Sequence, residues 1–87
     1  MASRSKKATD LRYATGEAIR ELRESLGLNQ SDFWSPFGVT QSGTSRYEAG
    51  RRVPRAVLML IQIAHGTEAQ AKAMVERLRT HLGSRAA

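Results

Sequence analysis

The residues best suited to chemistry lie in one short polar stretch of the sequence. Gln41, Ser42 and Gly43 follow one another, and Arg46 comes five residues after Gln41. A glutamine amide donates and accepts at once, which matches the N7 and N6 edge of adenine, and an arginine can reach a guanine edge or a phosphate. The small neighbours permit close approach of the backbone. The stretch therefore indicates contact with nucleic-acid bases and is a poor core helix.

Residues that could support catalysis or bind a metal are few. The sequence has no cysteine, and its two histidines, His65 and His81, lie 16 positions apart without a neighbouring carboxylate constellation. It contains no zinc-ligand spacing, no glycine-rich phosphate loop and no nucleophile–base pattern. We therefore expect no enzymatic activity, no metal and no cofactor.

Five segments with helical spacing surround and include the polar stretch: 16–26, 30–37, 40–49, 55–65 and 67–82. Their starts are marked by side chains that can accept from the free amides of a first turn, and Gln70 completes a capping box in the last segment. These N-cap residues are Thr15, Asn29, Thr40 and Thr67, and Pro54 suits the start of the fourth helix. Each segment is followed by a glycine that can end a helix in the left-handed conformation, namely Gly27, Gly38, Gly50, Gly66 and Gly83.

No strand-like alternation is sustained, so the predicted fold class is all-α, a compact bundle of about five short helices. The segment 55–65 is apolar nearly all round, which is typical of a helix enclosed on several sides. The last segment has a one-sided stripe of Ala71, Met74, Val75, Leu78 and Leu82. This stripe fits two interpretations equally: it covers the fourth helix within one chain, or it forms a dimer interface.

Length and charge agree with a single basic domain. The 87 residues suit one domain, and the net charge of +6 suits a polyanionic partner. Residues 1–14 hold four basic side chains and one acidic one, which predicts a flexible N-terminal arm that is solvated or follows DNA phosphates. The domain is then expected over residues 15–83, with a tail at 84–87. Without a membrane-length apolar run or a signal peptide, a cytoplasmic, nucleoid-associated location is expected.

The polar stretch and its flanks also resemble a known family. Residues 16–65 are similar to the phage repressor and Cro class of helix-turn-helix domains, the XRE family. The resemblance rests on Leu28-Asn29-Gln30, Gly38-Val39-Thr40-Gln41-Ser42, Ser45-Arg46-Tyr47-Glu48 and Gly50-Arg51-Arg52. It implies a DNA-binding transcriptional regulator that reads the major groove with the helix starting at Thr40, most simply a repressor that blocks polymerase.

The resemblance also implies roles for single residues. Side chains expected to face base edges are Gln41, Ser42, Ser45 and Arg46, and those expected near the DNA backbone are Gln30, Thr40, Arg51 and Arg52. Gln30 is further expected to brace Gln41. An ion pair between Arg23 and Glu48 would pin the first helix to the recognition helix. Tyr47 is expected mainly in the core.

Two residues depart from the family pattern. Trp34 stands where the family usually has a small residue, at the crossing of the two motif helices, and Gly43 and Thr44 replace bulkier neighbours nearby. We interpret this as redistributed volume and place Trp34 in the core. Pro36 removes a helical hydrogen bond and clashes with the preceding turn, so it should shorten or bend the first motif helix.

One recognition helix reads only a few base pairs, so a homodimer on a partly palindromic operator is expected. Two other binding functions compete with this interpretation. The same fold serves as an antitoxin that binds DNA and a toxin partner, and a non-specific architectural protein would bind unrelated duplexes equally. The pair Gln41 and Ser42 favours base reading over the architectural role.

Overall fold

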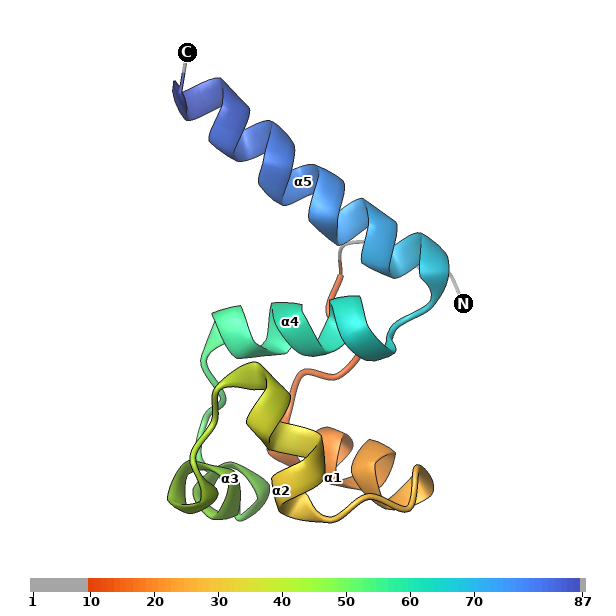
Figure 1. The fold of residues 1–87 in the computed structure, drawn as a ribbon, viewed down its shortest axis with the longest axis vertical. Helices are drawn as coiled ribbons and strands as arrows, with labels where there is room; N and C mark the ends of the chain where they lie inside the picture. Colours follow the sequence, from red (N-terminus) through yellow and green to blue (C-terminus); the bar gives the residue numbers. More distant parts are fainter. Residues whose placement is uncertain (1–9, 87) are drawn as a thin grey trace, which may run out of the picture.

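The computed structural model describes residues 10–86 of the chain and the side chains of residues 10–80. This part of the chain contains five α-helices and one short 3₁₀ helix, joined by turns and loops (Figure 1). In chain order they are α1 (Gly16–Ser25), α2 (Gln30–Trp34), η1 (Ser35–Phe37), α3 (Gln41–Glu48), α4 (Arg55–His65) and α5 (Glu68–Ala86). The all-α fold class predicted from the sequence is therefore correct.

The helices begin at the four predicted cap residues. The side chains of Thr15, Asn29 and Thr40 each accept a hydrogen bond from the backbone N–H three residues later, at 3.1, 2.7 and 3.1 Å. At the start of α5, Thr67 Oγ1 accepts from the N–H of Gln70 while Gln70 Oε1 accepts from the N–H of Thr67. Each cap satisfies backbone donors that the helix itself leaves without partners.

The first motif helix is short because of its proline. The α-helical geometry of α2 ends at Trp34, and residues Ser35–Phe37 tighten into a 3₁₀ turn with Pro36 in its first turn. A proline has no N–H to continue an α-helix, which is the physical reason predicted for this break. Gly38 then adopts a left-handed backbone, with φ of 78°, and turns the chain toward α3.

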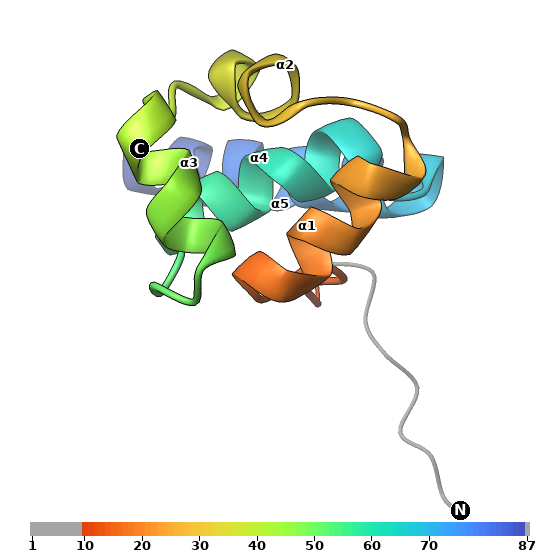
Figure 2. The same cartoon turned by 90° about the horizontal axis from the view of Figure 1, so that it is seen from below.

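The helices are stacked in layers around α4. Figures 1 and 2 show α1, α2 and α3 on one side of α4 and α5 on the other. The core lies between α4 and the first three helices and contains Ile19, Phe33, Trp34, Val53, Leu58 and Ile61. The enclosure expected for the apolar helix 55–65 is found on these two sides, although Leu60 of α4 remains 46% exposed.

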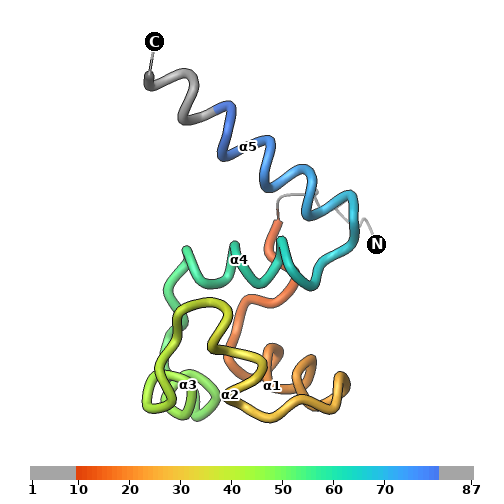
Figure 3. The backbone as a smooth tube through the Cα atoms, viewed as in Figure 1, coloured from red at the N-terminus to blue at the C-terminus, as the bar shows by residue number. Residues whose placement is uncertain are grey.

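A buried glutamine fixes the N-terminal segment to α4. Gln62 is fully buried, its Oε1 accepts from the backbone N–H of Arg12, and its Nε2 donates to the carbonyl of Asp10 at 2.7 Å. Leu11 and Tyr13 pack against the core. The backbone of this segment leads from the start of the described chain to α1 (Figure 3). Residues 10–14 are thus part of the folded domain and not of the flexible arm predicted for 1–14, whose first nine residues lie outside the described part of the chain.

The last helix follows one of its two predicted arrangements. Met74 of α5 is fully buried, so the helix covers α4 within the same chain, and in Figure 1 it diverges from α4 toward its C-terminal end. Val75 and Leu78 stay exposed. Among the helices of residues 10–86, none is both long and apolar enough to cross a membrane.

Two glycines do not end helices in the predicted way. Gly66 has an extended backbone with φ of −73°, and it is needed for space, because a Cβ there would lie 2.6 Å from the carbonyl oxygen of Gln62. Gly83 lies inside α5, which continues to Ala86 instead of ending near residue 82 and leaving a tail from residue 84. A glycine inside a helix costs only about 1 kcal/mol relative to alanine, and no proline follows to stop the helix.

A third glycine has a structural role that the sequence did not reveal. Gly16 begins α1 and is buried against the C-terminal turn of α3. A Cβ at this position would overlap the carbonyl oxygen of Tyr47 and would lie 2.7 Å from its carbonyl carbon. The backbones of α1 and α3 therefore touch directly, and only glycine permits this approach.

We predict that Gly16→Ala lowers the free energy of unfolding by about 3 kcal/mol or more, the upper end for overpacking, because the atoms in the way belong to the backbone. Urea denaturation followed by circular dichroism measures this loss. Glu17→Ala, at the exposed neighbouring position, is the control and should change stability by less than about 0.5 kcal/mol. A loss below about 1 kcal/mol for Gly16→Ala would show that the two helices can separate at little cost.

Candidate nucleic-acid interface

The helix α3, which the resemblance implies to be the recognition helix, has two distinct faces. Thr44 is buried and Tyr47 and Glu48 are partly buried, so these three residues, spaced three and four apart, face the protein. The four residues predicted to face DNA bases are all exposed on the rest of the helix, namely Gln41, Ser42, Ser45 and Arg46. The helix thus presents an outer polar surface that no other part of the described chain covers.

The N-terminal turn of α3 is exposed and narrow. Thr40 caps the helix, and Gly43 sits against this cap, where a Cβ would lie 3.3 Å from both Thr40 Oγ1 and Val39 Cγ1. The absence of a side chain at Gly43 keeps the turn narrow. Arg51 and Arg52 follow the other end of the helix and are exposed. Positive charge therefore flanks the helix at its C-terminal end.

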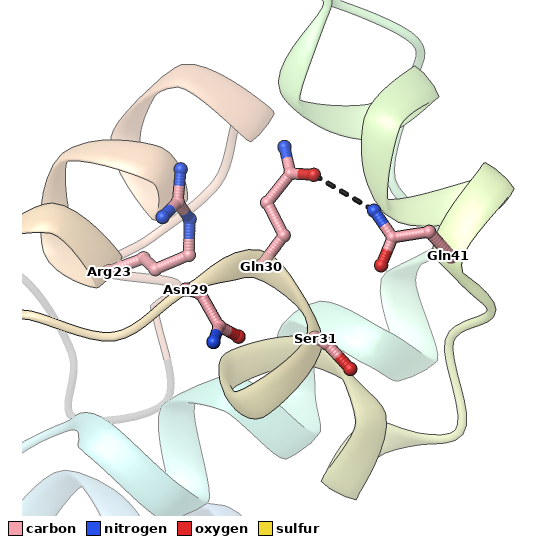
Figure 4. Close-up of a pocket in the computed structure, with 5 residues that line it drawn as sticks. All are labelled: Arg23, Asn29, Gln30, Ser31 and Gln41. Atoms are coloured by element: carbon pink, nitrogen blue, oxygen red, sulfur yellow. Dashed lines mark hydrogen bonds between the residues drawn. The ribbon is translucent and has the colours of Figure 1, made fainter.

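Two glutamines join the motif helices at this surface. Gln41 Nε2 donates to Gln30 Oε1 at 3.0 Å, which is the contact that the resemblance implied (Figure 4). Gln30 is partly buried at the start of α2. Beside the pair lies a hollow of about 430 Å³, lined also by Arg23, Asn29 and Ser31. Donor groups thus surround an open recess next to the first turn of α3.

The carboxylate of Glu48, at the C-terminal end of α3, binds side chains of both α1 and α2. Its side chain is only 5% exposed, and it accepts four hydrogen bonds. Arg23 donates from Nε to Oε2 at 2.8 Å and from Nη2 to Oε1 at 2.9 Å, a bidentate pair. Trp34 Nε1 donates to Oε2 at 2.7 Å, and Gln30 Nε2 donates to Oε1 at 3.1 Å. The expected contact between Arg23 and Glu48 is therefore present within a larger network.

The network keeps Glu48 ionised. Burial opposes the charged form, but the hydrogen bonds from Arg23, Trp34 and Gln30 and the charge of Arg23 outweigh it, so the pKa of Glu48 lies below its ordinary value. The hydrogen bond to Glu48 likewise raises the pKa of Arg23. At neutral pH the carboxylate is therefore an acceptor only.

Arg23 also fixes the turn between α1 and α2. Its Nη1 donates to the carbonyl of Leu28 at 2.9 Å, and the N–H of Leu28 donates back to the carbonyl of Arg23. One guanidinium thus connects α1, the following turn and α3. Because the start of α2 follows directly, the position of Gln30 depends on the same side chain.

The sequence placed Trp34 correctly in the core but missed its indole N–H. Trp34 is fully buried and lies against Tyr47, with ring centroids 5.7 Å apart. A buried indole N–H almost always has an acceptor, and this rule is the signal that could have led to Glu48. No group of three potential metal ligands occurs among the residues that the structure describes.

The helices α2 and α3, the turn at Gly38 and the exposed polar start of α3 define a helix-turn-helix (HTH) domain. Residues 20–64, slightly more than half of the chain, match the family model described as an RsaL-like HTH domain. The chain therefore belongs to the RsaL-like HTH family, and an HTH domain implies DNA binding. No significant match was found among curated proteins or among solved structures.

We predict that Arg23→Ala and Glu48→Ala each lower the free energy of unfolding by about 2–4 kcal/mol, because each leaves a largely buried charge without its partner. The double variant should lose much less than the sum of the two. Urea unfolding of the four proteins measures this coupling. Strict additivity would show that the two residues are not coupled.

The matched control is the exposed ion pair between Arg20 and Glu24 on α1. These two side chains are 3.1 Å apart but more than half exposed. Arg20→Ala should therefore cost less than about 0.5 kcal/mol. This comparison separates the effect of burial from that of losing an arginine.

Proposed function

We propose that the protein is a sequence-specific transcriptional repressor that docks α3 in the major groove of DNA. The observation that carries this proposal is the exposed first turn of α3, whose glutamine is held by a second glutamine. The finer resemblance to phage repressors and Cro (the XRE class) guides how we assign contacts. Repression follows most simply from occlusion of the polymerase site, which needs no effector.

Gln41 keeps the groups that a base reader needs. Its contact with Gln30 uses one N–H, and within the described residues its second N–H and its Oε1 have no other partner. A free amide donor next to a free acceptor pairs with N7 and N6 of adenine. Ser42, Ser45 and Arg46 lie beside it and complete the reading surface. Arg46 is the residue that can reach a guanine.

Contacts with the DNA backbone are assigned to Gln30, Thr40, Arg51 and Arg52. Gln30 donates one N–H to Glu48, and its second N–H has no partner within the described residues, so it remains for a phosphate oxygen. Thr40 is exposed at the N-terminus of α3, and the arginines follow its C-terminus. Phosphate contacts at both ends of the helix would fix its register on the duplex.

We predict that Gln41→Ala weakens binding to the preferred site by about 1–3 kcal/mol and relaxes preference at one base pair. Arg51→Ala and Arg52→Ala should instead weaken all duplexes similarly and reduce the salt slope by about one unit each. Selection from a random DNA pool supplies the site, and titrations at several salt concentrations measure the effects. Equal weakening on random DNA and on the selected site by Gln41→Ala would contradict base reading.

A homodimer is part of the same proposal. An eight-residue recognition helix reads too few base pairs alone, and a two-fold dimer places two such helices about 34–36 Å apart on one face of DNA. Apolar surface for this contact lies on α4 and α5. Leu60, Val75 and Leu78 are 46%, 38% and 37% exposed, and Leu78 also lines a hollow with Met59.

We predict that the double variant Val75→Glu/Leu78→Glu is monomeric at concentrations where the wild type is a dimer. It should bind a full palindromic site no better than a half-site. Leu26→Glu on α1, at a leucine that is 47% exposed, is the control and should remain dimeric. Sedimentation of free and DNA-bound protein tests this. A wild type that is monomeric in both states would exclude the dimer.

A further inference from the structure

We propose that Trp34 is a positioning residue for base reading: its indole N–H holds the Glu48 carboxylate, which sets the amide orientation of Gln30 and, through it, of Gln41. The part of this inference that concerns DNA rests on the proposed function. Trp34 itself is fully buried and touches no outer surface of α3. Its influence would pass through three successive hydrogen bonds of 2.7, 3.1 and 3.0 Å.

The first step is the position of the carboxylate. Glu48 Oε2 receives hydrogen bonds from Arg23 Nε and Trp34 Nε1, which come from α1 and α2 respectively. Arg23 draws the carboxylate toward α1, and Trp34 draws it toward α2. Without the indole N–H, Oε2 keeps only its bond from Arg23. The carboxylate would then turn toward α1 and away from Gln30.

The second step is the polarity of the chain of hydrogen bonds. An ionised carboxylate only accepts, so Gln30 must turn its NH₂ group toward Glu48. The Oε1 of Gln30 then faces Gln41, which donates an N–H to it. The acceptor Oε1 of Gln41 and its remaining N–H are left for a base. Glu48 thus decides which way round both amides are placed.

The third step is the consequence for specificity. If Gln30 were released from Glu48, its amide could rotate and present NH₂ to Gln41. Gln41 would then turn its own oxygen inward and offer only N–H groups to the groove. An amide in that orientation no longer matches the donor and acceptor pattern of adenine. Loss of the indole N–H is therefore expected to change base preference more than overall affinity.

The chain offers a clean test, because Trp34 is its only tryptophan. Replacement of tryptophan by β-(3-benzothienyl)alanine keeps the bicyclic shape and puts sulfur in place of the N–H. In ¹⁵N spectra of the free wild type, the two Gln41 side-chain amide protons should exchange with solvent at different rates, because the proton donated to Gln30 is protected. In the sulfur variant this protection should be lost. The preference for the selected base pair over its transversion should fall at least about fivefold.

Phe33→Leu is the packing control. Phe33 lies next to Trp34 on α2, is almost fully buried and meets the indole edge-on with ring centroids 5.7 Å apart, yet its phenyl ring has no group that could hydrogen-bond to the Glu48 carboxylate. This variant should lower the melting temperature but leave the Gln41 amide signals and the base preference unchanged. The same loss of amide protection in Phe33→Leu would show that packing alone is responsible and would overturn the proposal.

Two further outcomes would also overturn it. Retained protection of the Gln41 amide in the sulfur variant would show that the indole N–H does not position it. Lost protection with unchanged base preference would show that the network does not serve reading. If the wild type bound all duplexes equally, the proposed function would fail, while the amide spectra would still decide whether Trp34 positions Gln41.

Discussion

The ionised Glu48 carboxylate is the constraint on which the arrangement of the helices depends. A buried charge is costly, and its position near the C-terminus of α3 adds an unfavourable interaction with the helix dipole. Donors from α1 and α2 offset both effects, and they do so only when the three helices lie together. The ion pair therefore acts less as a source of net stability than as a condition on geometry. The carboxylate of Glu48 has all its hydrogen-bond donors only when α3 lies in this one position against α1 and α2.

A steric contact between α1 and α3 limits how these two helices can pack. Arg23 reaches Glu48 because α1 and α3 approach closely, and the approach is possible because Gly16 leaves room for the carbonyl of Tyr47. Within α4, Gln62 performs a comparable task, since its buried amide binds the backbone at residues 10 and 12. The Glu48 carboxylate and the Gln62 amide are thus both buried, hydrogen-bonded polar groups that fix the relative position of segments far apart in sequence.

Local signals in the sequence predicted local structure well. The caps at Thr15, Asn29, Thr40 and Thr67 and the break at Pro36 depend on a few neighbouring residues, and all are found. The contact between Arg23 and Glu48 came from a family resemblance. Three features needed the folded chain, namely the space required at Gly16, the acceptor of the Trp34 indole and the partners of Gln62. Each of these contacts joins residues at least 14 positions apart in the sequence, and a pattern of neighbouring residues does not indicate contacts over that separation.

The network also divides the surface that we propose reads bases into two kinds of position. The side chains of Ser42, Ser45 and Arg46 are exposed and make no hydrogen bonds to the rest of the described chain, so in the proposed function their replacement alters base contacts and leaves the network intact. Gln41 is different, because replacing it removes the donor to Gln30 Oε1. A change at Gln41 thus acts on the reading surface and on its support together. If α3 reads bases as proposed, base preference can therefore vary freely at the three outer positions, while Gln41 remains coupled to the carboxylate that holds the helices in place.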